Sequence, residues 1–182
     1  MSSRGFRFVL VALFAALVVV GAVFSIPLPP PLPPVTLAVF FALLSGMVLG
    51  PLGGLATSAL YLGLGIVGMP VFANGSGGFG HLAGPTGGFI LGYAGAASVA
   101  GLVADRKRYT FLRALAGGVA GVVALYAIGL PWFRAVLDAR PDRDVSMVAA
   151  FIIMAPYLVG DLVKAFARSE EHTSELQSPN TI

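Results

Sequence analysis

Between two strongly apolar runs the chain reads Met69-Pro-Val-Phe-Ala-Asn-Gly-Ser-Gly-Gly-Phe-Gly-His-Leu-Ala-Gly-Pro-Thr-Gly-Gly-Phe89. This stretch, the glycine-rich loop, contains seven glycines, no charged residue and one carboxamide, that of Asn74. Backbone without Cβ atoms can approach a ligand closely. Non-helical backbone at the depth of a membrane is tolerated only where protein buries it or where it lines a cavity. We therefore expect the loop to form part of a ligand-binding pocket.

The composition around this loop is that of a protein that crosses the membrane several times. Of 182 residues, 57% are hydrophobic and 10% are charged, which is more apolar surface than a soluble domain of this size can bury. The formal net charge of +3 is too small to indicate a nucleic-acid-binding surface. Without cysteine, and with two histidines, the sequence predicts no disulfide, no metal site and no cofactor.

Six apolar segments follow one another along the chain, each near the ~20 residues that cross ~30 Å of hydrocarbon. The first is interpreted as an uncleaved span, because no Ala-x-Ala cleavage site follows it. The second and third are short, so we expect tilt or partial spanning; Gly50 and Pro51 between them are typical of a tight turn from one helix into the next. Pro131 is expected to end the fifth. The predicted spans are 8–24, 35–50, 51–68, 86–104, 112–130 and 146–167.

Lysine and arginine residues predict the orientation in the plasma membrane. With six spans, both termini share one side. That side collects Arg4, Arg7, Arg106, Lys107, Arg108 and Arg113. The opposite side has Arg134, Arg140 and Arg143, balanced by Asp138, Asp142 and Asp144. We therefore expect both termini to be cytoplasmic and the glycine-rich loop to face outwards.

The last fifteen residues do not fit the rest of the chain. After Ala167 the apolar pattern stops at Arg168-Ser-Glu-Glu-His-Thr-Ser-Glu-Leu-Gln-Ser178, a string that matches the in-frame translation of a common sequencing adapter. We therefore divide the chain into a membrane domain, residues 1–167, and a non-native-looking tail, residues 168–182, which is excluded from fold reasoning.

Small residues recur every fourth position from the loop through the fourth span. They are Gly80, Gly84, Gly88, Gly92, Ala96, Ala100 and Ala104, and Gly117 and Gly121 repeat the spacing in the fifth span. Such ridges let helix backbones approach closely in membranes. We expect this stripe to pack helices within the chain.

An acidic and a basic residue lie inside the predicted sixth span. Asp161 and Lys164 are three positions apart, so they share one helical face. Ionisable groups within a span are costly and are functional candidates by default. A structural alternative is a self-neutralising pair, or a Lys164 that extends its ammonium group to the membrane interface.

These motifs together resemble the BioY family, the substrate-binding membrane subunits of energy-coupling-factor (ECF) biotin transporters. The resemblance is carried by Gly65-Ile-Val-Gly-Met-Pro-Val-Phe72, Gly84-Pro-Thr-Gly-Gly-Phe-Ile-Leu-Gly-Tyr93 and Gly160-Asp-Leu-Val-Lys164. It covers most of residues 8–166. The chain departs from the family pattern at Val159, in place of the usual proline, and at Ala38, in place of a common glutamine, and its first external loop is longer in proline than usual.

The resemblance implies an all-α membrane protein, a bundle of six transmembrane helices like an ECF S-component, that captures biotin and is not itself an enzyme. It implies that the positions of Asp161 and Lys164 contact biotin. The ureido ring of biotin needs an acceptor and a donor, which Asp161 and Asn74 can supply, and its carboxylate needs a cation such as Lys164. Further candidates for the binding site are Phe72, Gly84, Thr86, Tyr93 and Tyr157, with Phe79 and Phe89 as possible apolar walls.

Partner subunits are implied as well. The sequence has no Gly-Lys-Ser/Thr phosphate-binding loop, so ATP hydrolysis would belong to ABC-type ATPases. Ala12-Leu-Phe-Ala-Ala16 resembles the Ala-x-x-x-Ala motif that these subunits present to a transmembrane coupling subunit, and Ala12 and Ala16 are the predicted docking residues.

Two other functions are alternatives to biotin capture. Ser76 and His81 share the glycine-rich loop, but no Gly-x-Ser-x-Gly motif or third orienting residue supports a serine protease. The remaining alternative is a membrane binding protein or channel for another small vitamin or carboxylate.

Overall fold

The computed structural model describes residues 3–26, 34–105 and 110–139. Within these ranges the chain is helical apart from its turns and two isolated bridges. The elements are α1 (Ser3–Val23), α2 (Ala38–Leu49), α3 (Pro51–Ile66), the 3-10 turn η1 (Ala73–Gly75), α4 (Phe79–Leu82), α5 (Gly87–Ala104) and α6 (Phe111–Asp138). The predicted sixth span, 146–167, and the tail, 168–182, lie outside the described residues.

Three of the described helices are long and apolar enough to cross a membrane, namely Gly5–Val23 within α1, α5 and α6. The helices α2 and α3 are shorter apolar helices of 12 and 16 residues, as predicted. Gly50, with φ 82°, joins them, and Pro51 is the first residue of α3. A side chain at Gly50 would be strained in this left-handed backbone, whereas Pro51 loses no hydrogen bond at a helix start.

The prediction that Pro131 ends the fifth span was wrong, because α6 continues through Pro131 to Asp138. A proline inside a helix removes one backbone hydrogen bond and crowds the preceding turn, at a cost of about 3 kcal/mol. Beyond it, however, Phe133 and Leu137 are both buried in the core. Burying two such side chains contributes roughly 1.5–3 kcal/mol each, so packing outweighs the local preference.

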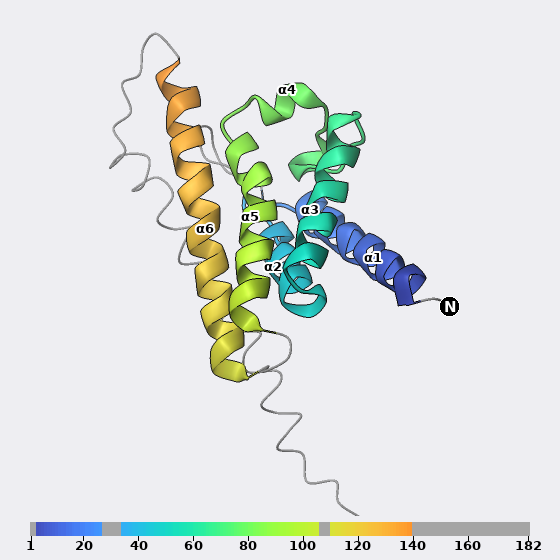
Figure 1. The fold of residues 1–182 in the computed structure, drawn as a ribbon. Coiled ribbons are helices and arrows are strands. Elements are labelled where there is room, and N and C mark those ends of the chain that lie inside the picture. Colours follow the sequence, from blue (N-terminus) through green and yellow to red (C-terminus); the bar gives the residue numbers. More distant parts are fainter. Residues whose placement is uncertain (1–2, 27–33, 106–109, 140–182) are drawn as a thin grey trace, which may run out of the picture.

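The helix α5 lies at the centre of the bundle, with α6 on one side and α2 and α3 on the other (Figure 1). Its small residues make these contacts possible. A Cβ atom on Gly88 would meet Trp132 of α6, and one on Gly117 would meet the Ala100 carbonyl. On the other side, a Cβ on Gly46 of α2 would meet the Ala97 carbonyl. The stripe along α5 therefore packs helices within the chain, as predicted.

Each end of the α5/α6 pair carries an ion pair between an arginine and an aspartate. At one end, Asp105 and Arg113 form an ion pair with 3.1 Å between Oδ2 and Nη1. The far end of α6 lies at the same end of the bundle as η1 and α4 (Figure 1), and there Arg134 pairs with Asp138 at 3.0 Å. The glycine-rich loop thus covers one end of the helix bundle.

Candidate ligand-binding site

The backbone of the glycine-rich loop folds back onto the end of α3. The amide of Gly78, with φ 87°, donates to the Gly65 carbonyl at 2.7 Å. At Gly77 a Cβ atom would collide with the Met69 carbonyl. These two glycines are required by the fold of the loop itself, through a left-handed conformation and a close backbone crossing.

An aromatic cluster lies directly beneath the loop. The side chain of Phe72 is 0% exposed, that of Tyr61 1% and that of Tyr93 7%. The ring of Tyr61 meets Phe72 edge-on with centroids 5.5 Å apart, and Tyr93 lies 6.0 Å from Tyr61 on the other side. Because a Cβ on Gly65 would fall on the Phe72 ring, the glycine in α3 makes the space that Phe72 fills.

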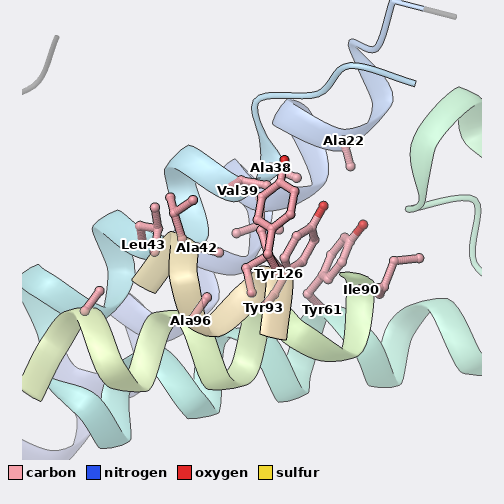
Figure 2. Packing of buried hydrophobic residues seen from close by; sticks show 14 of the residues in the cluster. Ala22, Ala38, Val39, Ala42, Leu43, Tyr61, Ile90, Tyr93, Ala96 and Tyr126 are labelled. Atoms are coloured by element: carbon pink, nitrogen blue, oxygen red, sulfur yellow. The ribbon is translucent and has the colours of Figure 1, made fainter. Parts of the chain in front are cut away.

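Three tyrosines from three helices belong to the same buried core, and the rings of Tyr61 and Tyr93 are 6.0 Å apart. Tyr61 of α3, Tyr93 of α5 and Tyr126 of α6 point their hydroxyls the same way, towards the side of the bundle that carries Ala22 and Ala38 (Figure 2). Buried phenol groups combine a large apolar surface with one hydrogen-bonding group. Such a row can pack against a fused apolar ring and also meet a polar edge.

The imidazole of His81 packs against the aromatic cluster at Phe72. It stacks on the Phe72 ring, with centroids 5.4 Å apart and planes 26° apart. Burial lowers the pKa of His81 and so favours the neutral form of its ring. The Ser76 hydroxyl lies 3.5 Å from Nε2 but donates to the Ala73 carbonyl at 2.7 Å. This geometry is that of loop packing rather than of an activated serine.

Asn74 lies at the exposed tip of the turn that follows Phe72. Its backbone is left-handed, with φ 58° and ψ 27°. The Asn74 Oδ1 accepts a hydrogen bond from the Ser25 hydroxyl at 2.9 Å. The backbone amide of Asn74 donates to the Ser25 hydroxyl oxygen at 3.2 Å. These two hydrogen bonds link the end of α1 to the glycine-rich loop.

Gly84 and Thr86 lie where the loop enters α5. The indole N–H of Trp132 donates to the Gly84 carbonyl at 3.0 Å, so α6 holds this part of the loop. The carbonyl of Thr86 accepts from the amides of Phe89 and Ile90, which makes Thr86 the residue that starts the helix. Its side chain makes no capping bond.

The structure therefore brings some predicted site residues together and separates others. Phe72 and Tyr93 meet in one cluster, while Asn74 lies outside it. Phe79 is 72% exposed and does not line this core, and Phe89 packs edge-on against Tyr126. Tyr157, Asp161 and Lys164 lie outside the described residues.

Sequence reasoning missed Tyr61, Trp132 and Ser25. Tyr61 lies inside an apolar span with no motif around it, and Ser25 is an unremarkable residue at a helix end. Trp132 offered one available signal, since it is the only tryptophan of the chain and follows a proline. Trp132 and Ser25 contact the loop across 48 and 49 positions of sequence, whereas Tyr61 meets Phe72 from the neighbouring helix.

The alanines of the predicted docking motif lie on the outer surface of α1. Ala12 and Ala16 are exposed, whereas Ala15, Val18 and Ala22 are buried against the bundle. Exposed Val9, Leu13 and Val20 continue the outer face. An apolar face with small residues suits either lipid or a partner helix.

Comparison with known proteins identifies relatives along nearly the whole chain. The model of the BioY family matches residues 2–169. A biotin transporter BioY of Thermotoga maritima is 48% identical over 153 residues, covering 84% of this chain and 85% of the relative. A biotin transporter BioY of Rhodobacter capsulatus is 42% identical over 163 residues, covering 85% of each chain.

A probable biotin transporter BioY of Pyrococcus horikoshii is 41% identical over 157 residues, covering 86% of this chain and 87% of the relative. The crystal structure of the S-component for biotin from an ECF-type ABC transporter superposes with a TM-score of 0.80. The match covers 98% of this chain and 95% of that chain at 19% identity. The likeness shows that the two share the helical S-component fold.

Proposed function

The chain belongs to the BioY family, and we propose that it captures biotin at the plasma membrane as the substrate-binding subunit of an ECF-type transporter. It is a membrane binding protein rather than an enzyme. The observation that carries the proposal is the buried cluster of Tyr61, Phe72 and Tyr93 directly beneath the glycine-rich loop. Its location at one end of the bundle suits a ligand that enters from one side of the membrane.

The chemistry of biotin matches this arrangement. The fused ring and aliphatic chain need apolar walls, which the aromatic cluster supplies. The ureido group needs hydrogen-bonding partners, for which we assign Asp161 as acceptor and Asn74, at the exposed tip of the loop, as donor. Lys164 would pair with the carboxylate, because it is the only lysine in a predicted span. Tyr157, Gly84 and Thr86 are proposed to complete the site.

Transport requires an energy source, and the sequence contains no Gly-Lys-Ser/Thr motif for binding ATP. The proposal therefore includes partners, a transmembrane coupling subunit and ABC-type ATPases. The exposed small-residue face of α1 around Ala12 and Ala16 is the proposed contact with the coupling subunit. Lipid would cover the remaining apolar outer surface.

We expect the full chain, purified in detergent without partners, to bind biotin. Isothermal titration calorimetry should give a saturable signal at micromolar biotin, with thiamine and riboflavin as control ligands that give none. A thermal shift with biotin should accompany it, because a ligand that binds only the folded state stabilises it. No heat and no thermal shift at micromolar biotin would refute the proposal.

The same titration tests the proposed domain boundary. A version that ends at Ala167 should bind biotin as the full chain does, because residues 168–182 are proposed not to belong to the membrane domain. Loss of binding on removal of the tail would instead assign those residues to the folded protein.

A further inference from the structure

Ser25 connects two parts of the chain that are 49 residues apart. Its hydroxyl donates to the side-chain Oδ1 of Asn74 at 2.9 Å and accepts from the backbone amide of Asn74 at 3.2 Å. We propose that Ser25 is a positioning residue for the ligand, because it fixes the Asn74 carboxamide so that the NH2 group is the one left for the ureido carbonyl of biotin. This inference rests on the proposed function.

The Ser25 side of the contact is held by the backbone around it. The amide of Ser25 donates to the Val23 carbonyl at 2.9 Å, just after α1 ends. The next residue, Ile26, exchanges two backbone hydrogen bonds with Val35 at 2.9 and 3.0 Å. The hydroxyl of Ser25 therefore projects from a short segment that is fixed on both sides.

The Asn74 side is held independently. The amide of Phe72 donates to the Ser76 carbonyl at 2.8 Å, and the amide of Gly75 donates to the Phe72 carbonyl at 3.1 Å, which closes a tight turn with Asn74 at its tip. The side chain of Phe72 anchors this turn in the core. Asparagine is among the few residues other than glycine that adopt the left-handed backbone found here.

Hydrogen-bond accounting then fixes the orientation of the carboxamide. A serine hydroxyl has one proton, which it gives to Oδ1, while one of its lone pairs accepts the Asn74 N–H. In the reverse orientation the NH2 group would lie against the Ser25 oxygen, and the hydroxyl proton would have to go to water instead of Oδ1, because the contact is exposed. Among the described residues, the NH2 group of Asn74 has no hydrogen-bond partner, so it can donate to a ligand carbonyl.

The test is a double-mutant cycle on the full chain, read as biotin affinity by calorimetry. Ser25→Ala removes the hydroxyl, Ser25→Thr retains it, and Asn74→Gly removes the carboxamide while tolerating the left-handed backbone. We expect Ser25→Ala to weaken biotin binding about threefold to tenfold, the range for one net hydrogen bond. Ser25→Thr should restore affinity to within about twofold, and Ser25→Ala should add less than about twofold in the Asn74→Gly background.

Several results would overturn the inference. One is unchanged affinity in Ser25→Ala, and another is a Ser25→Thr variant as weak as Ser25→Ala. An equal loss from Ser25→Ala with and without the Asn74 side chain would show that Ser25 acts on the loop without orienting the carboxamide. An unmodified chain that binds no biotin would overturn the proposed function together with this inference, whereas the first three results would leave the function standing.

Discussion

Single residues of the proposed site contribute either apolar walls or charged and polar contacts. The apolar walls come from residues such as Phe72, which the structure places in the core. Specific polar contacts are assigned to Asp161 and Lys164, which lie outside the described residues and stay a prediction. The charge of Lys164 is the easiest of these to isolate experimentally, because biotin has one carboxylate.

We expect Lys164→Ala to weaken biotin binding more than binding of biotinamide, in which the carboxylate is replaced by a neutral amide. Loss of a hydrogen bond to a charged group costs about 1.5–3 kcal/mol, roughly tenfold to a hundredfold in affinity. Calorimetric titration of both ligands against both proteins measures the difference. Equal losses for the two ligands would make Lys164 a structural partner of Asp161 instead.

At the scale of elements, α3 shows how one glycine shapes the site. The close contact between Gly65 and the Phe72 ring lets the loop return onto the end of the helix. Gly63, two residues earlier in the same helix, has no atom within 4 Å of the position of a Cβ. The pair provides a variant and its matched control.

Gly65→Ala should lower the melting temperature and biotin affinity, because overpacking of a core costs typically 1–3 kcal/mol. Gly63→Ala should leave affinity unchanged and keep or raise stability, since alanine favours a helix by about 1 kcal/mol over glycine. Thermal unfolding and biotin titration measure both effects. If Gly65→Ala matched Gly63→Ala in both measurements, the close packing of Phe72 would not matter for the site.

The outer face of α1 is the second element with a testable role. Ala12→Trp or Ala16→Trp should leave biotin binding intact and abolish co-purification with the coupling subunit and its ATPases, because bulk prevents close helix approach. Ala127→Trp, at an exposed alanine of α6, serves as the control for bulk alone. Continued co-purification would place docking elsewhere, and loss of biotin binding would make the alanines part of the fold.

At the scale of the whole molecule, the orientation in the membrane decides from which side the proposed ligand, biotin, would enter. The chain contains no cysteine, so a single introduced thiol reports the location of one position. Gly80, with open space around it, represents the glycine-rich loop, and Lys107 represents the opposite side.

A membrane-impermeant maleimide should label Gly80→Cys in intact cells and should label Lys107→Cys only after permeabilisation. The physical reason is the excess of lysine and arginine on the side of Lys107. Retained biotin binding controls for folding of both variants. The reverse labelling pattern would place the loop in the cytoplasm and contradict the proposed direction of uptake.

Features that depend on local signals could be predicted from the sequence. Apolar length predicted the helices, Gly50 and Pro51 predicted the turn between α2 and α3, and small residues at fourfold spacing predicted the packing of α5. The loop and span motifs also identified the family. These signals are readable because backbone geometry and helix periodicity act over a few residues.

Which residues meet across the chain depends on the tertiary structure. It extended α6 through Pro131 because Phe133 and Leu137 are buried beyond it. It brought Tyr61 under the loop, joined Trp132 to Gly84 and joined Ser25 to Asn74. The last two contacts link residues 48 and 49 positions apart. No local pattern records such pairs, since burial and hydrogen bonding at that separation arise only once the helices have packed.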